Sequence, residues 1–228
     1  WALLMVAASA GPPAARSALW TDELYSLATA ELKPGAMLSA LYHVRQGWYD
    51  QPPLYFLLLR AVLPAGEAPL TLRLPSLLFV AAMTALWGIM LRRRGLPLAA
   101  ALGLEVWLAW HPMIRFQASS VRMYGLLLLE TGAAFWTIEG LMQAHGRRRA
   151  DLTLARAALL AAVVYTSYFG AYFVLGVALT GLGASVLPGP IDRRRAGLLI
   201  LAACAGAAVV LLPWVPAILR VMALERPH

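Results

Sequence analysis

Residues 72–94 read LRLPSLLFVAAMTALWGIMLRRR, an apolar run from Leu72 to Leu91 that is followed by Arg92-Arg93-Arg94. At a rise of about 1.5 Å per residue, this run forms a helix about 30 Å long, which matches the hydrocarbon core of a bilayer. Arginine clusters next to apolar segments mark cytoplasmic turns under the positive-inside rule. The stretch therefore predicts a membrane-spanning helix whose C-terminal end faces the cytoplasm.

The composition of the whole chain agrees with this interpretation. Hydrophobic residues make up 61% and charged residues 13% of the 228 residues, and the mean hydropathy is +0.70. These values exclude an ordinary soluble domain. The net charge of +8 comes largely from short arginine clusters between apolar runs, so we attribute it to topology and expect no nucleic-acid partner. The single cysteine, Cys204, permits no internal disulfide.

Two further clusters, Arg147-Arg148-Arg149 and Arg193-Arg194-Arg195, constrain the topology. If all three clusters lie on one side, the chain between them crosses the membrane an even number of times. The stretch 152–187 spans only about 54 Å as a helix, so we expect a short pair of segments broken near Tyr165–Gly170. Pro213 and Pro216 predict a kink near the end of the last segment. The result is an all-α, polytopic transmembrane bundle with about seven apolar segments: residues 1–15, 72–91, 96–110, 123–142, two within 152–187, and 196–219.

The same topology places residues 16–71 in a long outer loop that carries juxtamembrane helices. Thr21–Leu32 has an apolar face typical of an amphipathic helix lying on a membrane, and Ala36–Val44 predicts a second, weaker helix. Leu54–Leu63 follows Pro52-Pro53 and is too short to span. We expect residues 1–228 to form a single domain, which is the N-terminal portion of a longer protein.

The outer loop contains an acidic pair, Asp22-Glu23, in a chain with only 11 acidic residues. Two explanations remain open. Acidic residues in the first turn of a helix are favoured by its dipole, and Thr21 can act as the N-cap, although Leu24 then spoils a capping box. Alternatively, adjacent carboxylates at the edge of a membrane segment form a functional site.

Further polar residues fall on the predicted outer side, at helix ends and turns. Each of them has an ordinary explanation: Arg73 and Arg115 snorkel to lipid phosphates, a histidine before proline occupies a turn, and tyrosines form an interfacial belt. Arg122 is badly placed for the dipole near a helix start, and a structural carboxylate would suffice as its partner. A metal site is left open, because two carboxylates and a histidine show no diagnostic spacing. These residues are Arg73, His111, Arg115, Arg122, Tyr124 and Asp50.

In order along the chain, four segments resemble the glycosyltransferase C superfamily, in particular its protein O-mannosyltransferase and aminoarabinose transferase-like family. The segments are Trp20-Thr21-Asp22-Glu23-Leu24-Tyr25, Gln51-Pro52-Pro53-Leu54-Tyr55, Leu72-Arg73-Leu74-Pro75-Ser76 and Ala118-Ser119-Ser120-Val121-Arg122-Met123-Tyr124. Gln51 replaces the histidine or lysine usual in the second segment. Arg122-Met123-Tyr124 replaces an acidic version of the fourth.

The resemblance implies an inverting transfer of a sugar from a polyprenyl-phosphate donor to an acceptor hydroxyl. The acceptor would be a lipid, a glycan or a protein, at the outer face of a bacterial inner membrane. Asp22 would be the base, and Glu23 would orient the acceptor or the base. Arg122 would stabilise the departing phosphate, with Arg73 and Arg115 behind it. The substrate-binding set would also include Tyr124, Asp50, His111 and Tyr55, and a divalent metal is left open.

A different class of function also fits the composition. Glu105 and Glu130 fall inside predicted crossings, where carboxylates are costly without a role or a partner, and this favours a transporter or lipid flippase. A structural or assembly subunit would explain the topology but not the acidic pair.

Overall fold

The computed structural model describes residues 1–43, 51–143, 147–187 and 191–224, and these residues form helices without a strand. Two short 3₁₀ turns, Leu63–Ala65 and Leu212–Trp214, interrupt them. The predicted all-α class is confirmed. The helices are α1 (Ala2–Arg16), α2 (Thr21–Glu31), α3 (Pro34–His43), α4 (Leu54–Val62), α5 (Pro69–Arg93), α6 (Leu98–Trp110), α7 (Pro112–Ala118), α8 (Tyr124–Gln143), α9 (Arg147–Thr166), α10 (Gly170–Val186), α11 (Ile191–Leu211) and α12 (Val215–Leu224).

Among the residues that the structure describes, two helical stretches are long and apolar enough to cross a membrane: Pro69–Arg93 and Ile191–Arg220. The predicted seven-span bundle is therefore not confirmed. For α6 and α10 the physical reason is length, since they have 13 and 17 residues, giving about 20 and 26 Å against a core of about 30 Å. Two candidate spans give weak support for a membrane location.

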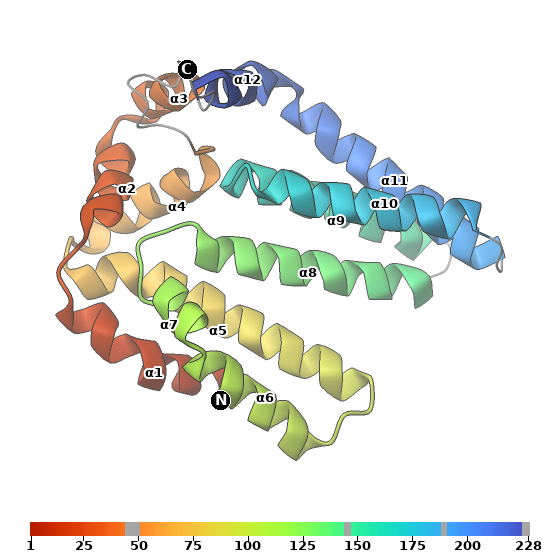
Figure 1. Ribbon diagram of the computed structural model, residues 1–228, viewed down its shortest axis with the longest axis horizontal. Helices are drawn as coiled ribbons and strands as arrows, with labels where there is room; N and C mark the ends of the chain where they lie inside the picture. The colour runs from red at the N-terminus through yellow and green to blue at the C-terminus, as the bar shows by residue number, and fades with distance from the viewer. Residues whose placement is uncertain (44–50, 144–146, 188–190, 225–228) are drawn as a thin grey trace. The chain divides into compact units, whose positions relative to one another are not determined.

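The helices group into two compact units, and the expectation of a single domain stays a prediction. The first unit comprises residues 1–37 and 54–132. In it, α5 packs against α1 and α6, and the short α7 packs against both α5 and α1 (Figure 1). Its core contains Ala10 and Ala14 of α1 facing Leu77, Val80 and other residues of α5. Small side chains on α1 allow the two helices to approach closely.

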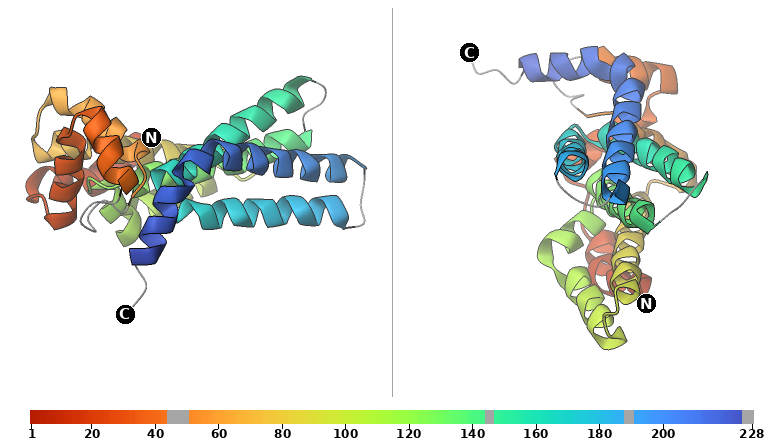
Figure 2. Two further views of the ribbon diagram at one scale, coloured as in Figure 1. Left: turned by 90° about the horizontal axis from the view of Figure 1, so that it is seen from above. Right: turned by 90° about the vertical axis from the view of Figure 1, so that its right-hand side faces the viewer.

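The second unit comprises residues 38–53 and 133–228 and is built around α9, α10 and α11. A Cβ added to Gly197 would lie 2.6 Å from the carbonyl oxygen of Gly181, so this glycine pair brings α10 and α11 together. The break between α9 and α10 falls at residues 167–169, which confirms the predicted interruption. The predicted kink is also confirmed, because the chain turns from α11 into α12 through Leu212–Trp214 (Figure 2).

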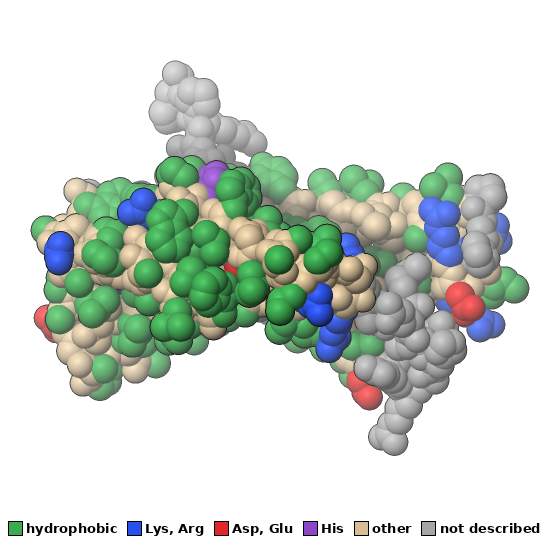
Figure 3. Space-filling view, turned by 90° about the horizontal axis from the view of Figure 1, so that it is seen from below, with side chains coloured by type: hydrophobic (Ala, Val, Ile, Leu, Met, Phe, Trp, Pro, Cys, Tyr) green, Lys and Arg blue, Asp and Glu red, His purple; other side chains and the backbone are tan. Residues whose placement is uncertain are grey.

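Large hydrophobic side chains are exposed throughout the described chain. They include Leu4, Leu78, Trp107, Leu179 and Val209, each at least 45% exposed. Figure 3 shows one face on which hydrophobic side chains predominate and charged side chains occur in a few groups. Charged residues such as Glu23, Arg73 and Arg156 are buried at the same time. In soluble proteins hydrophobic side chains are mostly buried and charged side chains mostly exposed. The opposite distribution at these positions agrees with a chain whose surroundings are partly lipid.

Helix α2 shows the same distribution on a smaller scale. Its buried residues are Glu23, Ser26, Thr29 and Ala30, whereas Leu24 is 51% exposed. The polar face of α2 therefore lies inside the first unit, and its apolar face points outward. An amphipathic helix at a membrane surface has this orientation.

Candidate functional site

The site begins at the N-terminus of α2, where the structure corrects one expectation. The N-cap is Trp20, whereas Thr21 was expected to cap the helix. With Trp20 as N-cap, Glu23 occupies the third helical position, and its Oε2 accepts the backbone N–H of Trp20 at 3.2 Å. This is the carboxylate half of a capping box. The dipole explanation of the acidic pair thus applies to Glu23 in particular.

Glu23 also forms a buried ion pair with Arg73 of α5. Arg73 Nε donates to Glu23 Oε1 at 2.9 Å, and Arg73 Nη2 donates to Oε2. The side chains of Arg73 and Glu23 are 2% and 0% exposed. A two-point contact between guanidinium and carboxylate is the strongest geometry available to such a pair.

The remaining donors of Arg73 hold the end of α1. Nη1 donates to the carbonyl oxygens of Ala14 and Ser17 at 3.0 and 2.8 Å, and Nη2 donates to Ala18 at 3.0 Å. These are carbonyls that a helix leaves without partners at its C-terminus. Arg73 is therefore fully occupied inside the protein, and this geometry argues against direct contact with a phosphate.

Glu23 reaches one further element, the turn between α7 and α8. The backbone N–H of Val121 donates to Glu23 Oε1 at 2.7 Å. The carboxylate thus accepts four hydrogen bonds from three separate segments, which leaves it no capacity for a substrate. We conclude that Glu23 holds the turn in place, and that orientation of an acceptor by direct contact does not fit its surroundings.

Fixing Val121 places the next residue, Arg122, beside Asp22. Arg122 Nη1 lies 3.2 Å from Asp22 Oδ2. In contrast to the pair beneath them, these side chains reach the surface, with Arg122 19% and Asp22 47% exposed. The two adjacent acids therefore pair with two different arginines, one inside the protein and one at its surface.

Two tyrosines lie close to Arg122. The Arg122 guanidinium carbon lies 5.7 Å from the ring centre of Tyr124, within cation–π range. Tyr55 of α4 is buried, and burial raises the pKa of its phenol. The Ser76 hydroxyl and the positive charge of Arg122 lower this pKa, whereas the negative charge of Glu23 raises it further. The Ser76 hydroxyl itself lies 3.5 Å from the Arg122 carbonyl oxygen. The site therefore includes a buried phenol, and the Ser76 hydroxyl lies next to the backbone of Arg122.

The other predicted site residues have their contacts elsewhere. Arg115 Nε donates to the carbonyl of Ser9 at 3.2 Å, a group that lacks a helical partner because Pro13 has no N–H. His111 is the N-cap of α7 and lies 5.3 Å, ring to ring, from Trp107. This position agrees with a turn residue. Asp50 lies outside the described residues.

The donor groups do not form a metal site. Within the described chain there is no group of three or more His, Cys, Asp or Glu side chains that could hold a metal ion. Asp22 offers the accessible carboxylate of the acidic pair, since the oxygens of Glu23 are occupied. One carboxylate beside an arginine is a poor ligand set for a divalent cation.

Sequence reasoning missed three structural contributors. The Val121 N–H gives no signal in a sequence, because every residue except proline carries this group. Ser76 belongs to the segment Leu72-Arg73-Leu74-Pro75-Ser76, but the sequence assigned it no role at the site. Arg60 Nη1 donates to the carbonyls of Ala30, Glu31 and Leu32 and so caps α2. A lone charge within the apolar stretch Leu54–Leu63 was the signal that could have identified Arg60.

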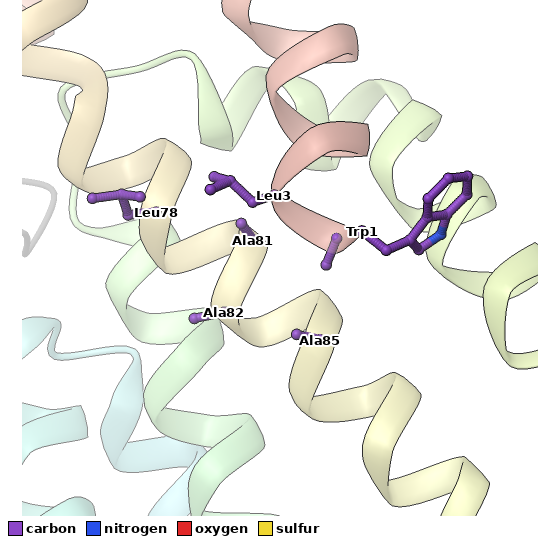
Figure 4. Close-up of a pocket in the computed structure, with 7 residues that line it drawn as sticks. Trp1, Leu3, Leu78, Ala81, Ala82 and Ala85 are labelled. Atoms are coloured by element: carbon purple, nitrogen blue, oxygen red, sulfur yellow. The ribbon is translucent and has the colours of Figure 1, made fainter.

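The first unit also has an apolar groove between α1 and α5. It is lined by Trp1, Leu3, Leu78 and Ala82 among others (Figure 4). The residues that line the groove carry no ionisable side chain. In comparisons with known proteins, no family model, no curated protein and no solved structure matches the chain.

Proposed function

We propose that this protein is an integral-membrane glycosyltransferase that moves a sugar from a polyprenyl-phosphate donor to an acceptor hydroxyl at the outer face of a bacterial inner membrane. The observation that carries this proposal is the surface pair of Asp22 and Arg122, 3.2 Å apart. It combines a carboxylate able to accept a proton with a cation able to bind a phosphate. The resemblance of four ordered segments to the glycosyltransferase C superfamily supplies the reaction.

In the proposed reaction the acceptor hydroxyl attacks C1 of the sugar from the face opposite the phosphate. The new bond joins the acceptor oxygen to C1, and the bond from C1 to the phosphate oxygen breaks, so the configuration inverts. Asp22 takes the proton of the hydroxyl, a role that contributes about 10²- to 10⁴-fold in rate. The polyprenyl phosphate leaves with the bonding electron pair, and Arg122 stabilises its added negative charge.

The buried residues serve this reaction indirectly. Glu23 ties Trp20, Arg73 and Val121 together, so Asp22 and Arg122 each follow directly on a fixed position. Catalytic groups need placement within fractions of an ångström, and a rigid support beneath them supplies it. In this proposal Glu23 and Arg73 are positioning residues.

The exposed hydrophobic side chains suit a lipid substrate. The helix that carries Arg73, Pro69–Arg93, is one of the two candidate membrane spans. Arg73 lies in its first turns, so the site would lie at one end of a span, near the membrane surface. A lipid-linked phosphate is presented at this depth.

The decisive experiment replaces Asp22 with Asn and measures sugar transfer from a polyprenyl-phosphate donor in membranes. We expect activity to fall at least about 10²-fold while expression and membrane insertion stay unchanged. Glu67→Gln removes an exposed carboxylate of the same outer loop and is the matched control. If Asp22→Asn and Glu67→Gln retain equal activity, Asp22 is not the base, and the acidic pair only begins a helix.

Transport or lipid flipping is the alternative, and Glu105 is the observation that favours it. This carboxylate lies in apolar helix α6, is 8% exposed, and packs against Gly88 of α5. Buried carboxylates in membrane helices often belong to translocation paths. In this case Glu105→Gln would abolish movement of a labelled lipid across vesicles, whereas Asp22→Asn would not.

A further inference from the structure

The contact between Asp22 and Arg122 conflicts with the geometry of the proposed reaction. An inverting displacement places the base and the leaving phosphate on opposite sides of C1. The acceptor oxygen must fit between the base and C1, which places the base about 6 Å from C1, the sum of a hydrogen bond and a reacting contact, and farther still from the phosphate. In this structure the carboxylate instead contacts the cation directly, at 3.2 Å.

Asp22 occupies one of the two terminal nitrogens of Arg122, Nη1. The Arg122 Nε is buried and has no hydrogen-bond partner, whereas Nη1 lies against the half-exposed Asp22. An anion arriving from solvent or from a membrane surface therefore meets Arg122 at its outer end. An anion that binds Nη1 of Arg122 is in direct competition with the carboxylate of Asp22.

We propose that the phosphate of the donor displaces Asp22 from Arg122, so that donor binding itself releases the base. This inference rests on the proposed function. Before the donor binds, the carboxylate and the guanidinium neutralise each other, and the base is held by its partner. After the donor binds, Arg122 contacts the phosphate, and Asp22 is free to accept the acceptor proton.

The energetics favour such an exchange. An ion pair between exposed side chains shifts an equilibrium by at most about fivefold. Arginine binds phosphate through two parallel charge-assisted hydrogen bonds, which are stronger. The buried pair beneath cannot exchange in the same way, because Glu23 and Arg73 are enclosed. The buried pair of Glu23 and Arg73 therefore holds the backbone next to Asp22 and Arg122 in place while the surface contact exchanges.

The test is a double-mutant cycle on binding of a short-chain polyprenyl monophosphate that carries no sugar. Binding is measured by calorimetry on the purified protein in detergent, with the corresponding polyprenyl alcohol as the phosphate-free control. Asp22→Asn should tighten binding about two- to fivefold, because the competitor for Arg122 is removed. Arg122→Gln should weaken binding, and adding Asp22→Asn to Arg122→Gln should change nothing further.

Each outcome has a distinct meaning. Tightening that persists in the Arg122→Gln background would reflect simple repulsion between Asp22 and the phosphate, and it would overturn the exchange. Unchanged binding by Asp22→Asn would overturn it as well, and in both cases the proposed glycosyl transfer would stand. Equal binding of phosphate and alcohol by the wild-type protein would overturn the donor class itself. Glu67→Gln should leave binding unchanged, which controls for net charge in the loop.

Discussion

Replacing Glu23 with Gln should destabilise the protein far more than the neighbouring change Asp22→Asn. Both substitutions convert one acidic group to its amide, and the two residues are adjacent in α2. The difference lies in their surroundings, since Glu23 is fully buried and Asp22 is half-exposed. The comparison therefore isolates the contribution of the buried pair.

The magnitude follows from the hydrogen bonds of Glu23. Its carboxylate accepts from Arg73 Nε and Nη2 and from the backbone N–H groups of Val121 and Trp20. A Gln amide accepts at its oxygen only, so its NH₂ group would face two donors. Removing one charge of a buried ion pair costs about 3–5 kcal/mol, against about 0–1 kcal/mol for an exposed pair.

The measurement is thermal unfolding in detergent, followed by intrinsic fluorescence. For a chain of this size a loss of 3–5 kcal/mol lowers Tm by on the order of 10 °C, whereas Asp22→Asn should lower it by about 4 °C or less. A comparable shift for the two variants would refute the reasoning. It would mean that Glu23 and Arg73 do not form a buried pair in the folded protein.

A second pair of variants tests why the charges are retained. Replacing a buried ion pair by apolar residues of similar size is often neutral. Here the double variant Glu23→Leu/Arg73→Met should remain well below wild-type stability, because Arg73 also holds the carbonyls of Ala14, Ser17 and Ala18. Full recovery in the double variant would show that these carbonyls find other partners.

Two further predictions concern the first unit. A Cβ on Gly88 would overlap the Glu105 carboxylate, whereas a Cβ on Gly103 would meet nothing within 4 Å. Gly88→Ala should therefore lower Tm, because overpacking costs about 1–3 kcal/mol. Gly103→Ala should raise Tm, because alanine gains up to about 1 kcal/mol in helix propensity over glycine. Burial raises the pKa of Tyr55 above the ordinary phenol value, so Tyr55 stays neutral at alkaline pH. The tyrosinate absorbance of wild type minus Tyr55→Phe should show no titration step up to about pH 11, and a step near pH 10 would contradict the burial.

Hydropathy and proline positions predicted much of the fold. Apolar runs located the long helices, and the break between α9 and α10 followed from the length of 152–187. The predicted number of membrane crossings, about seven, was not confirmed by the lengths of the helices. Composition shows that a segment is apolar, but helices such as α6, with 13 residues, fall short of a span. Parity between arginine clusters cannot correct for this, because it assumes that all three clusters lie on one side of the membrane and gives only an even number of crossings between them.

The arginines show where site prediction from sequence ends. Arg73, Arg115 and Arg122 were all expected at helix ends or turns, and all three were expected as phosphate ligands, with Arg122 favoured. The structure gives the first two internal carbonyl partners and leaves Arg122 at the surface. The carbonyls that Arg73 binds lack helical partners because α1 ends there, and the carbonyl that Arg115 binds lacks one because Pro13 has no N–H. The partner of each arginine therefore depends on the backbone of α1, which is far from both arginines in the sequence.

The acidic pair combines two roles because of helix geometry. Successive residues in a helix point about 100° apart, so adjacent acids in a first turn cannot both face inward. With Trp20 as N-cap, Glu23 reaches back to the start of α2 and inward to Arg73, which turns Asp22 toward the surface. The helix-capping and functional explanations are thus compatible, one for each residue. The carboxylate that begins the helix fixes the position of the carboxylate proposed to act on substrate.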